Sequence, residues 1–466
     1  MKKIKYIIVL MLIIASCGKE LDIKPTTQLE ADKAKESIEL LVIGAYSLVG
    51  SGGVANSDEG GLYSNDLILN GDLLASENYM SWRGTFSQFD EIANKAMSST
   101  NTSIIRMWRK AYSAINLANT ILEVLPTSNV DDPDLYKGQA LFIRGIMHFE
   151  LLRNWKEPST GLGVPIVKES TQRYEDIKYP ARATIDDSYA AIISDLEEAE
   201  QLLPEENDVY ATKYSAAAFL ARLYLERGRD NADYNKALTF ANEVIESDYY
   251  ALPGSVENAF NTTASTENIF EIQQTTQNNA GTANDGLTTF FACDPDTPGN
   301  TGRGDVQIDS AFIKLYEVED KRRALLIYEG TCNNGSVTSG KWKNPYTNIG
   351  VIRLSEMYLI RAEANKRLGS AVGATPVDDI NAIRSKANAS QYVTVGLDSI
   401  LTERELELAF EGMRIHDFKR LGKAIDTVDG DGNPITIDYT GPEYILPIPQ
   451  QDLNTNKNLI QNTYYK

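Results

Sequence analysis

Histidine and cysteine are scarce in this chain of 466 residues, which contains two histidines and three cysteines. The histidines and cysteines show no spacing typical of a zinc site, so we expect no bound metal and no cofactor. His148 lies among apolar residues and is most simply a core histidine. Cys293 and Cys332 lie in loop-like sequence. Whether they form a disulfide stays open, because the sequence does not give their separation.

Basic side chains and long apolar runs are also few. The chain has 45 Lys and Arg against 65 Asp and Glu, which gives a formal net charge of −20 at pH 7. This balance argues against nucleic acid and other polyanions as ligands, because Lys and Arg are needed to neutralise phosphate groups. No apolar run beyond the N-terminal region approaches the length of a transmembrane helix.

The N-terminal region has the composition of a secretory signal. Three lysines precede the short apolar run YIIVLMLII, which is followed by small residues. The sequence Ile14-Ala15-Ser16-Cys17 resembles a lipobox, the bacterial signal after which the cysteine is acylated and everything before it is removed. We therefore expect residues 1–16 to be a lipoprotein signal peptide and Cys17 to be the lipidation site. An ordinary cleaved signal is the alternative. Cleavage would remove three lysines and no acidic residue, so the net charge would change from −20 to −23.

Apolar residues recur at helical spacing in three parts of the chain, about 28–50, 100–250 and 350–466. Three helix starts have the pattern of a capping box, in which a threonine and an acidic residue three positions later satisfy free backbone N–H groups. These pairs are Thr184 with Asp187, Thr375 with Asp378, and Thr402 with Glu405. The pattern predicts a mostly α-helical protein, and we treat residues 17–466 as a single domain.

One segment has the pattern of a tetratricopeptide-like helix pair. Leu220, Ala221 and Tyr224 lie on one face of a predicted helix, and Gly228 ends that helix. Tyr234, Ala237 and Ala241 lie on the next helix, and large residues opposite small ones allow two helices to pack closely. The spacing is about four residues longer than in the usual repeat, so we expect a superhelical scaffold of helix pairs without a strict period.

Helical periodicity fails in two parts of the chain, about 51–99 and 251–349. We expect these loop-rich parts, with a short strand at NIFEIQ, to face the ligand, since binding residues are often carried on loops. The tripeptide Arg303-Gly304-Asp305 lies in this loop sequence, and we assign it no adhesion role. DGDGN, residues 429–433, resembles the start of a calcium loop, but Thr440 stands where the closing glutamate should be. A hairpin turn is the better prediction there.

The stretch LTERELELAFEGMRIHD, residues 401–417, raises the question of catalysis. Glu403, Glu407 and Glu411 recur every fourth residue and would share one helix face. Arg404 lies three positions before Glu407 and Arg414 lies three after Glu411, so we expect fixed ion pairs. A carboxylate held by arginine has a lowered pKa, which does not suit the general acid of a glycosidase. We therefore interpret the stretch as architecture.

Several segments, taken in order, resemble the SusD/RagB family of outer-membrane nutrient-binding lipoproteins. They are WRKAYSAINLAN, ALFIRGIMHFELLRNW with GVPIV, VIRLSEMYLIRAEA, INAIRSKA, ERELELAFEGMRIHDFKRLGK and the tail YILPIPQQDLNTNKNLIQNTYY. The stretch CGKELD also looks like the acidic sequence that directs such lipoproteins to the outer face. The resemblance runs from Cys17 to the last residue and implies four tetratricopeptide-like helix pairs that support a variable, loop-rich part.

The resemblance implies binding and import without catalysis. Family members resemble lids on a SusC-type TonB-dependent transporter and capture oligosaccharides or, in some branches, peptides. We therefore expect an oligosaccharide ligand, a SusC-like transporter as partner, and attachment to the outer membrane through the lipid anchor. A peptide-capturing member of the family is one alternative. A secreted glycoside hydrolase that uses Glu407 and Glu411 is the other.

A sugar site needs a flat aromatic ring for the C–H face of the sugar and polar groups for its hydroxyls. The stretch SENYMSWRGTFSQFD offers Tyr79 and Trp82 as platforms, with Asn78 and Arg83 as hydroxyl partners. The alternative for Trp82 is a core tryptophan that anchors a loop. The stretch KWKNPYTN offers Trp342 and Tyr346, which we rank lower.

Overall fold

The computed structural model describes residues 37–50, 61–263, 265–277, 279, 284, 286–293, 302–331, 336–428, 434–439 and 441–465. The predicted signal peptide, Cys17, Cys332 and the DGDGN stretch lie outside these residues. Cys293 is disulfide-bonded. Within the described part, no helix combines the length and the apolar character needed to cross a membrane.

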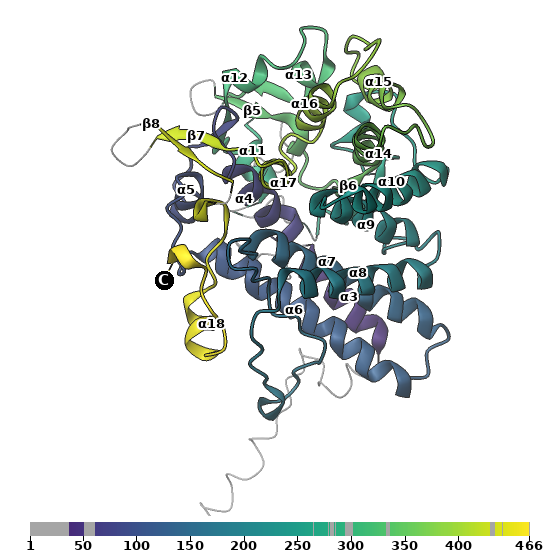
Figure 1. Ribbon diagram of the computed structural model, residues 1–466, viewed down its shortest axis with the longest axis vertical. Helices are drawn as coiled ribbons and strands as arrows, with labels where there is room; N and C mark the ends of the chain where they lie inside the picture. Colours follow the sequence, from purple (N-terminus) through teal and green to yellow (C-terminus); the bar gives the residue numbers. More distant parts are fainter. Residues whose placement is uncertain are drawn as a thin grey trace, which may run out of the picture.

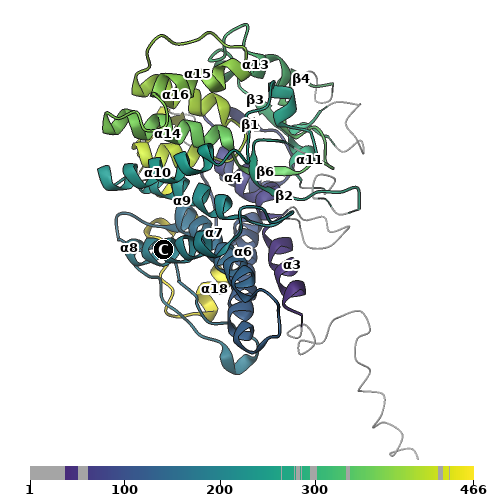
Figure 2. The same ribbon diagram turned by 90° about the vertical axis from the view of Figure 1, so that its right-hand side faces the viewer.

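Consecutive helices pack against one another and form the scaffold (Figure 1). In chain order they are α3 (Ile38–Val49), α6 (Thr102–Val124), α7 (Pro133–Trp155), α8 (Ile185–Leu202), α9 (Lys213–Arg227), α10 (Asn231–Glu246), α14 (Leu354–Leu368), α15 (Pro376–Lys386), α16 (Leu397–Glu407) and α17 (Arg414–Leu421). Each helix from α6 to α10 packs on the next, and α10 packs on α14, which contacts α15 and α16. Figure 2 shows this series from the side, stacked along the long axis. The prediction of a mostly α, tetratricopeptide-like fold is confirmed.

The local signals for helix pairs and caps are largely confirmed. α9 ends at Gly228, whose φ of +45° is left-handed, and α10 packs back on α9. The Thr184 hydroxyl accepts a hydrogen bond from the Asp187 N–H at 3.0 Å, and Thr375 caps α15 in the same way. The cap predicted at Thr402 is wrong, because Thr402 lies inside α16, whose N-cap residue is Gly396.

Shorter elements fill the other half of the molecule. The helices are α4 (Leu67–Leu73), α5 (Ser87–Ala93), α11 (Leu287–Phe291), α12 (Ser310–Ile313), α13 (Lys321–Leu325) and α18 (Gln450–Thr455). In the ranges given above, antiparallel pairs join β1 (Met80–Trp82) with β3 (Val306–Ile308), β2 (Asn268–Ile272) with β6 (Ile349–Arg353), β4 (Ile327–Glu329) with β5 (Val337–Ser339), and β7 (Ile425–Val428) with β8 (Pro434–Ile437). The strand predicted at NIFEIQ is β2, and the hairpin predicted around 429–433 is the β7–β8 pair.

The part expected to be loops at about 51–99 contains a buried helix instead. α4 is buried along its whole length, and Leu69 and Leu73 are fully covered. Gly71 allows the close approach of the turn before α17, because a Cβ on Gly71 would lie 2.4 Å from the Gly412 carbonyl oxygen. The apolar residues of this region therefore belong to the core.

The glutamate-rich stretch does not form one continuous helix. α16 ends at Glu407, and a tight turn over residues 408–413 leads into α17. Gly412 has a φ of +76°, and a Cβ there would lie 2.7 Å from the Ile68 Cα. Only glycine fits a left-handed position against such a close backbone neighbour, which is why the chain turns at this point.

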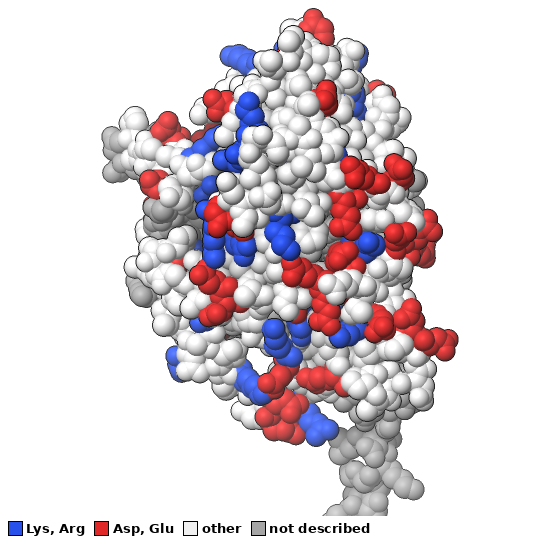
Figure 3. All heavy atoms as spheres, turned by 45° about the vertical axis from the view of Figure 1, so that its right-hand side comes forward, with Lys and Arg blue, Asp and Glu red and all other residues white. Residues whose placement is uncertain are grey.

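Acidic side chains dominate one side of the molecular surface. Figure 3 shows them gathered on the face formed by the right-hand side of Figure 1, where the ends of α8 and α10 lie. Asp186 and Glu198, both on α8, have side chains that are 74% and 43% exposed. This distribution agrees with the net charge of the chain and disfavours a polyanionic partner on that face.

Candidate ligand-binding site

The β1–β3 ribbon brings the predicted platform stretch to residues more than two hundred positions later. Trp82 pairs with Val306, and the Arg83 backbone N–H donates a hydrogen bond of 2.6 Å to the Asp305 carbonyl oxygen. Asn78, just before the ribbon, is exposed and has a left-handed φ of 55°. The ribbon therefore brings the segment after Trp82 next to the segment before Val306.

Tyr79 lies in the core. Its side chain is 1% exposed, and its ring stacks on Phe410 at a centroid distance of 5.1 Å with an interplanar angle of 11°. Phe312 meets the same ring edge-on at 4.7 Å, and the Phe410 N–H donates to the Tyr79 hydroxyl. Because these contacts enclose the ring, the assignment of Tyr79 as a stacking platform is corrected to a core residue.

Trp82 is also a core residue, as the alternative interpretation of the sequence has it. It is 8% exposed and packs against Phe89 and Phe290, both at 5.1 Å between ring centroids. Its Nε1–H is buried without a hydrogen-bond partner. The indole packs between Phe89 of α5 and Phe290 of α11 and is not available to a ligand. The assignment of Trp82 as a stacking platform is therefore corrected to a core residue.

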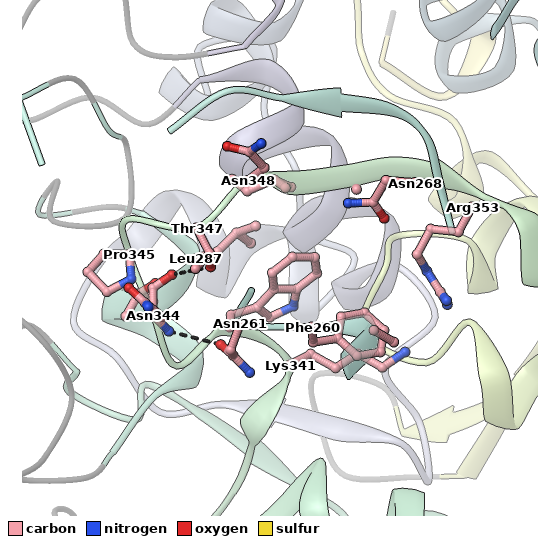
Figure 4. Close-up of a pocket in the computed structure, with 15 residues that line it drawn as sticks. Phe260, Asn261, Asn268, Leu287, Lys341, Asn344, Pro345, Thr347, Asn348 and Arg353 are labelled. Carbon is pink, nitrogen blue, oxygen red and sulfur yellow. Dashed lines mark hydrogen bonds between the residues drawn. The ribbon is translucent and has the colours of Figure 1, made fainter. Parts of the chain in front are cut away.

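Trp342 borders a small cavity (Figure 4) that is too small for a sugar ring. Trp342 is 6% exposed and donates its Nε1–H to the Phe410 carbonyl oxygen at 3.0 Å. The cavity has a volume of about 20 Å³, enough for one water molecule, and at its edge the Asn344 backbone N–H donates a hydrogen bond to the Asn261 side-chain oxygen at 2.9 Å. Tyr346 is partly exposed and does not line the cavity, although its neighbours Pro345 and Thr347 do. Trp342 is therefore corrected to a structural residue.

A group of side chains that ranges from exposed (Arg83, Asn284) to buried (Asp305) lies beside the buried Phe290. We call Phe86, Asn284, Arg303 and Asp305 the Arg303 cluster, which Arg83 adjoins. The Arg303 guanidinium lies 5.4 Å from the ring centroid of Phe86, and Nη1 donates to the Asn284 side-chain oxygen at 2.7 Å. Nε and Nη2 both donate to one Asp305 carboxylate oxygen, at 2.9 and 2.7 Å.

The geometry of the Arg303 cluster suits recognition of hydroxyl groups. Arg303 is 38% exposed, and Asp305 and Phe86 hold its planar guanidinium in place. A fixed cation beside a carboxylate, an amide and a half-buried ring offers donors, acceptors and an apolar face within one site. Of the residues predicted from sequence, Arg83 adjoins this cluster, because its backbone N–H donates to the Asp305 carbonyl oxygen and its side chain is exposed.

Phe86, Asn284, Arg303 and Asp305 were not among the residues predicted from the sequence. Phe86 lies in the same stretch as Trp82 and could have been found by testing every aromatic residue of that loop. Arg303 and Asp305 carry no local signal beyond their position in a glycine-rich loop. Only the pairing of β1 with β3 brings these two residues to residue 83.

The carboxylates proposed for a hydrolase lie in a buried ionic network. Glu407 is 2% exposed and accepts hydrogen bonds from Lys386 at 2.7 Å and Arg322 at 3.0 Å. Burial by itself would raise the pKa of Glu407, but the charges of Lys386, Arg353 and Arg322 outweigh it and hold the pKa well below its usual range. Such a carboxylate stays ionised and cannot serve as a general acid near neutral pH.

Arg404 and Arg414 form ion pairs, as predicted, but with acidic residues other than the predicted ones. Arg404 bonds Asp417 through Nε at 3.0 Å and Glu356 through Nη2 at 3.3 Å instead of Glu407. Arg414 pairs with Glu405 instead of Glu411. The reason is the turn after Glu407, because neighbours three positions apart face each other only within a continuous helix.

The two histidines are buried. His148 accepts a hydrogen bond at Nε2 from the Val167 N–H at 3.2 Å, and burial lowers its pKa to about 3, as expected for a core histidine. Burial likewise lowers the pKa of His416 well below its ordinary value. Across the described ranges, no group of three or more His, Cys, Asp or Glu side chains is arranged to hold a metal ion.

Two family models match most of the chain. One, described as starch-binding associating with outer membrane, matches residues 32–225, and the other, described as SusD family, matches residues 325–465. The chain is 26% identical to SusD-like protein P2 of Formosa agariphila, over 99% of both chains.

Solved structures share the fold over nearly the whole chain. A putative sugar binding protein from Bacteroides vulgatus is 29% identical, with a TM-score of 0.75 over 92% of this chain and 98% of that one. Surface glycan-binding protein A from Bacteroides thetaiotaomicron, solved in complex with laminarihexaose, is 22% identical, with a TM-score of 0.75 over 91% of this chain and 98% of that one. The second likeness shows a shared fold.

Proposed function

Because this chain belongs to the SusD/RagB-like family, we propose that it captures oligosaccharides at the cell surface and delivers them to a SusC-like TonB-dependent transporter. The family is one of starch- and glycan-binding proteins associated with the outer membrane. The sugar-binding name of the Bacteroides vulgatus protein and the laminarihexaose complex support the ligand class.

The observation that carries the proposal is the position of Arg303. Its guanidinium is accessible and donates hydrogen bonds to Asp305 and Asn284. The same group lies 5.4 Å from the ring centroid of Phe86. A sugar that places an apolar face on Phe86 would bring its hydroxyls within reach of this guanidinium, which the buried Asp305 holds in place. We place the ligand at the Arg303 cluster, with Arg83 at its edge.

Capture without cleavage is the second part of the proposal. The carboxylates Glu407 and Glu411 are tied to Lys386, Arg353 and Lys341 in the interior, and neither belongs to the Arg303 cluster. A glycosidase needs two carboxyl groups on either side of the scissile bond, one of them protonated. The ionised and buried state of Glu407 supports a binding role.

Attachment to the outer membrane is the third part. The lipobox-like sequence ending at Cys17 supports a lipid anchor, and acyl chains contribute about 0.8 kcal/mol per buried methylene. Several chains on one cysteine would hold the protein at the membrane beside its transporter.

The test is a calorimetric screen of neutral hexasaccharides, including laminarihexaose and maltohexaose, against the wild-type protein and three variants. Arg303→Ala and Phe86→Ala should each weaken binding about tenfold or more, because each removes one side of the site. Arg229→Ala, which changes an arginine between α9 and α10 whose side chain is 43% exposed and lies outside the site, should bind like wild type. Binding of an oligopeptide but of none of the sugars would select the peptide-capturing alternative.

A further inference from the structure

A second, larger cavity lies under a long loop that no part of the proposed function uses. We call residues 165–180 the strap. It leaves the scaffold after α7, contains only a short 3₁₀ turn at Tyr174–Asp176, and hangs below α6 and α8 with α18 beside it (Figure 1). A loop of this length without regular structure is usually functional.

Side chains hold both legs of the strap. On the first leg, the Asn119 amide donates to the carbonyl oxygens of Val167 and Glu169 at 3.1 and 3.2 Å, and the Asn116 oxygen accepts from the Thr171 N–H at 2.6 Å. On the second leg, Asn456 and Asn458 donate to the carbonyl oxygens of Pro180 and Tyr179 at 2.8 and 2.6 Å. The strap is therefore fixed at both ends, on α6 at its start and on the C-terminal segment at its end, and forms an arch beside α6.

The strap groove is the space beneath this arch. Its volume is about 1040 Å³, against about 20 Å³ for the cavity at Trp342. α6 contributes Trp108, Arg109, Tyr112 and Ser113 to its lining, the strap contributes Tyr179, and the C-terminal segment contributes Gln451. The volume is at the upper end of the range for small-molecule sites and has room for more than one sugar ring.

The chemistry of the lining favours an uncharged, hydroxyl-rich ligand. The lining holds three basic and three acidic residues, and two opposite pairs are in contact, Lys178 with Glu169, and Arg109 with Asp452 at 3.4 Å. The groove therefore presents no excess of one charge to attract an ion. Tyr179 is 44% exposed and Tyr112 is half-buried, so aromatic rings are accessible from two sides of the groove.

We propose that the strap groove is a second binding site for a neutral oligosaccharide, separate from the Arg303 cluster. Tyr179 and Tyr112 supply ring faces for the sugar, and Arg109, Gln451 and Ser113 supply groups for its hydroxyls. The proposal takes its ligand class from the proposed function but uses none of the same residues. Two separate sites on one chain would let it hold a long glycan at two points and raise its apparent affinity.

The test is hydrogen exchange of the full chain with a panel of neutral hexasaccharides made of glucose, xylose, mannose or N-acetylglucosamine, and with hexa-alanine as the peptide probe, each at millimolar concentration. At least one sugar should slow exchange in the strap and in the first half of α6, and should still do so in Arg303→Ala. Tyr179→Ala should weaken this binding about tenfold, and Ser113→Trp, which fills the groove from an exposed position, should abolish it. Tyr174→Ala is the matched control, because it changes a tyrosine of the same strap that is 86% exposed and lies outside the groove.

Each possible outcome decides the proposal. Protection confined to the Arg303 cluster would overturn the second site and leave the proposed function intact. Protection of the strap by hexa-alanine, but by no sugar, would assign the groove to a peptide and would also overturn it. Strap protection that persists in both Tyr179→Ala and Ser113→Trp would show that the groove is not the site. Strap protection that is normal in Arg303→Ala and lost in Ser113→Trp would support it.

Discussion

The guanidinium of Arg353 holds the Glu411 carboxylate through two hydrogen bonds, Nε to Oε2 at 2.9 Å and Nη2 to Oε1 at 2.7 Å. The same group reaches Glu407 at 3.3 Å and Glu267. Arg353 is the last residue of β6, and Glu267 lies just before β2. The network therefore joins the central β2–β6 pair to the end of α16, and its acids hold the fold together.

Glu407→Gln should destabilise the protein by about 3–5 kcal/mol, because it leaves buried cations without their partner. Urea unfolding at pH 7 measures this loss. Glu198→Gln is the control, since this exposed carboxylate pairs with Lys137 on the surface and should cost less than about 1 kcal/mol. A stable Glu407→Gln protein that had lost a sugar-cleaving activity of the wild type would instead support the hydrolase.

Lowering the pH should destabilise the protein through the same acids. The charges of neighbouring arginines outweigh burial and keep the pKa of Glu356, Glu363 and Asp417 below its ordinary value. An acid whose pKa is lowered by folding contributes stability above its unfolded pKa and loses it as the pH falls through the folded pKa. Chemical unfolding between pH 7 and pH 3 should therefore show a steady loss below about pH 4.5. A free energy of unfolding that stays flat to pH 3 would contradict the network.

The Asp72→Asn substitution should stabilise the protein at alkaline pH, whereas Glu407→Gln should destabilise it. Burial raises the pKa of Asp72 to about 7, although the Gly412 N–H donates to one of its oxygens at 3.0 Å, and the other oxygen is buried without a partner. An acid with a raised pKa costs stability as the pH rises from its unfolded to its folded pKa. Asn keeps the bond to Gly412 and carries no charge, so the variant should be the more stable protein at pH 8. Urea unfolding of both proteins at pH 8 and pH 4 measures this difference in stability, which should be smaller at pH 4. An equal difference at the two pH values would contradict a raised pKa for Asp72.

Trp82→Ala should lower the free energy of unfolding by about 3–5 kcal/mol, because it removes a large side chain packed on Phe89 and Phe290. Arg303→Ala should change stability far less, since its side chain is 38% exposed. Melting curves and sugar titrations of both variants separate the two roles. Weakened binding in Trp82→Ala with unchanged melting would restore the platform interpretation of this residue.

Cys17→Ala should release the protein from membranes, because the variant has no thiol at the predicted lipidation site. Fractionation of cells that express each form measures the distribution. Metabolic labelling with a fatty acid is the companion readout, and a Cys17→Ala protein that still incorporates label would contradict the anchor.

Local features of the fold could be predicted from the sequence. Helix periodicity, the Thr184 and Thr375 caps and the stop at Gly228 depend on residues within a few positions of each other, and the structure has all of them. The NIFEIQ strand and the hairpin around 429–433 are likewise local. Neither the turn after Glu407 nor the burial of α4 could be read from the pattern, because both depend on the close approach of Gly71 and Gly412.

The candidate site depended on contacts between distant residues. Periodicity and composition do not distinguish a buried aromatic residue from one that faces a ligand. The sequence predicts Tyr79 and Trp82 as stacking platforms, but both side chains are buried. Arg303 and Asp305 reach this face only through the pairing of β3 with β1. The strap groove is beyond sequence reasoning for the same reason, because residues from α6, the strap and the C-terminal segment form it.

The most direct test incubates the wild-type protein with the hexasaccharide panel, measures binding by calorimetry and then analyses the recovered sugar by chromatography. The account predicts saturable binding of at least one sugar, at least tenfold weaker binding in Arg303→Ala, and recovery of the sugar at its full length. Shortened products from the pure protein, or binding that is unchanged in Arg303→Ala and Phe86→Ala, would contradict it.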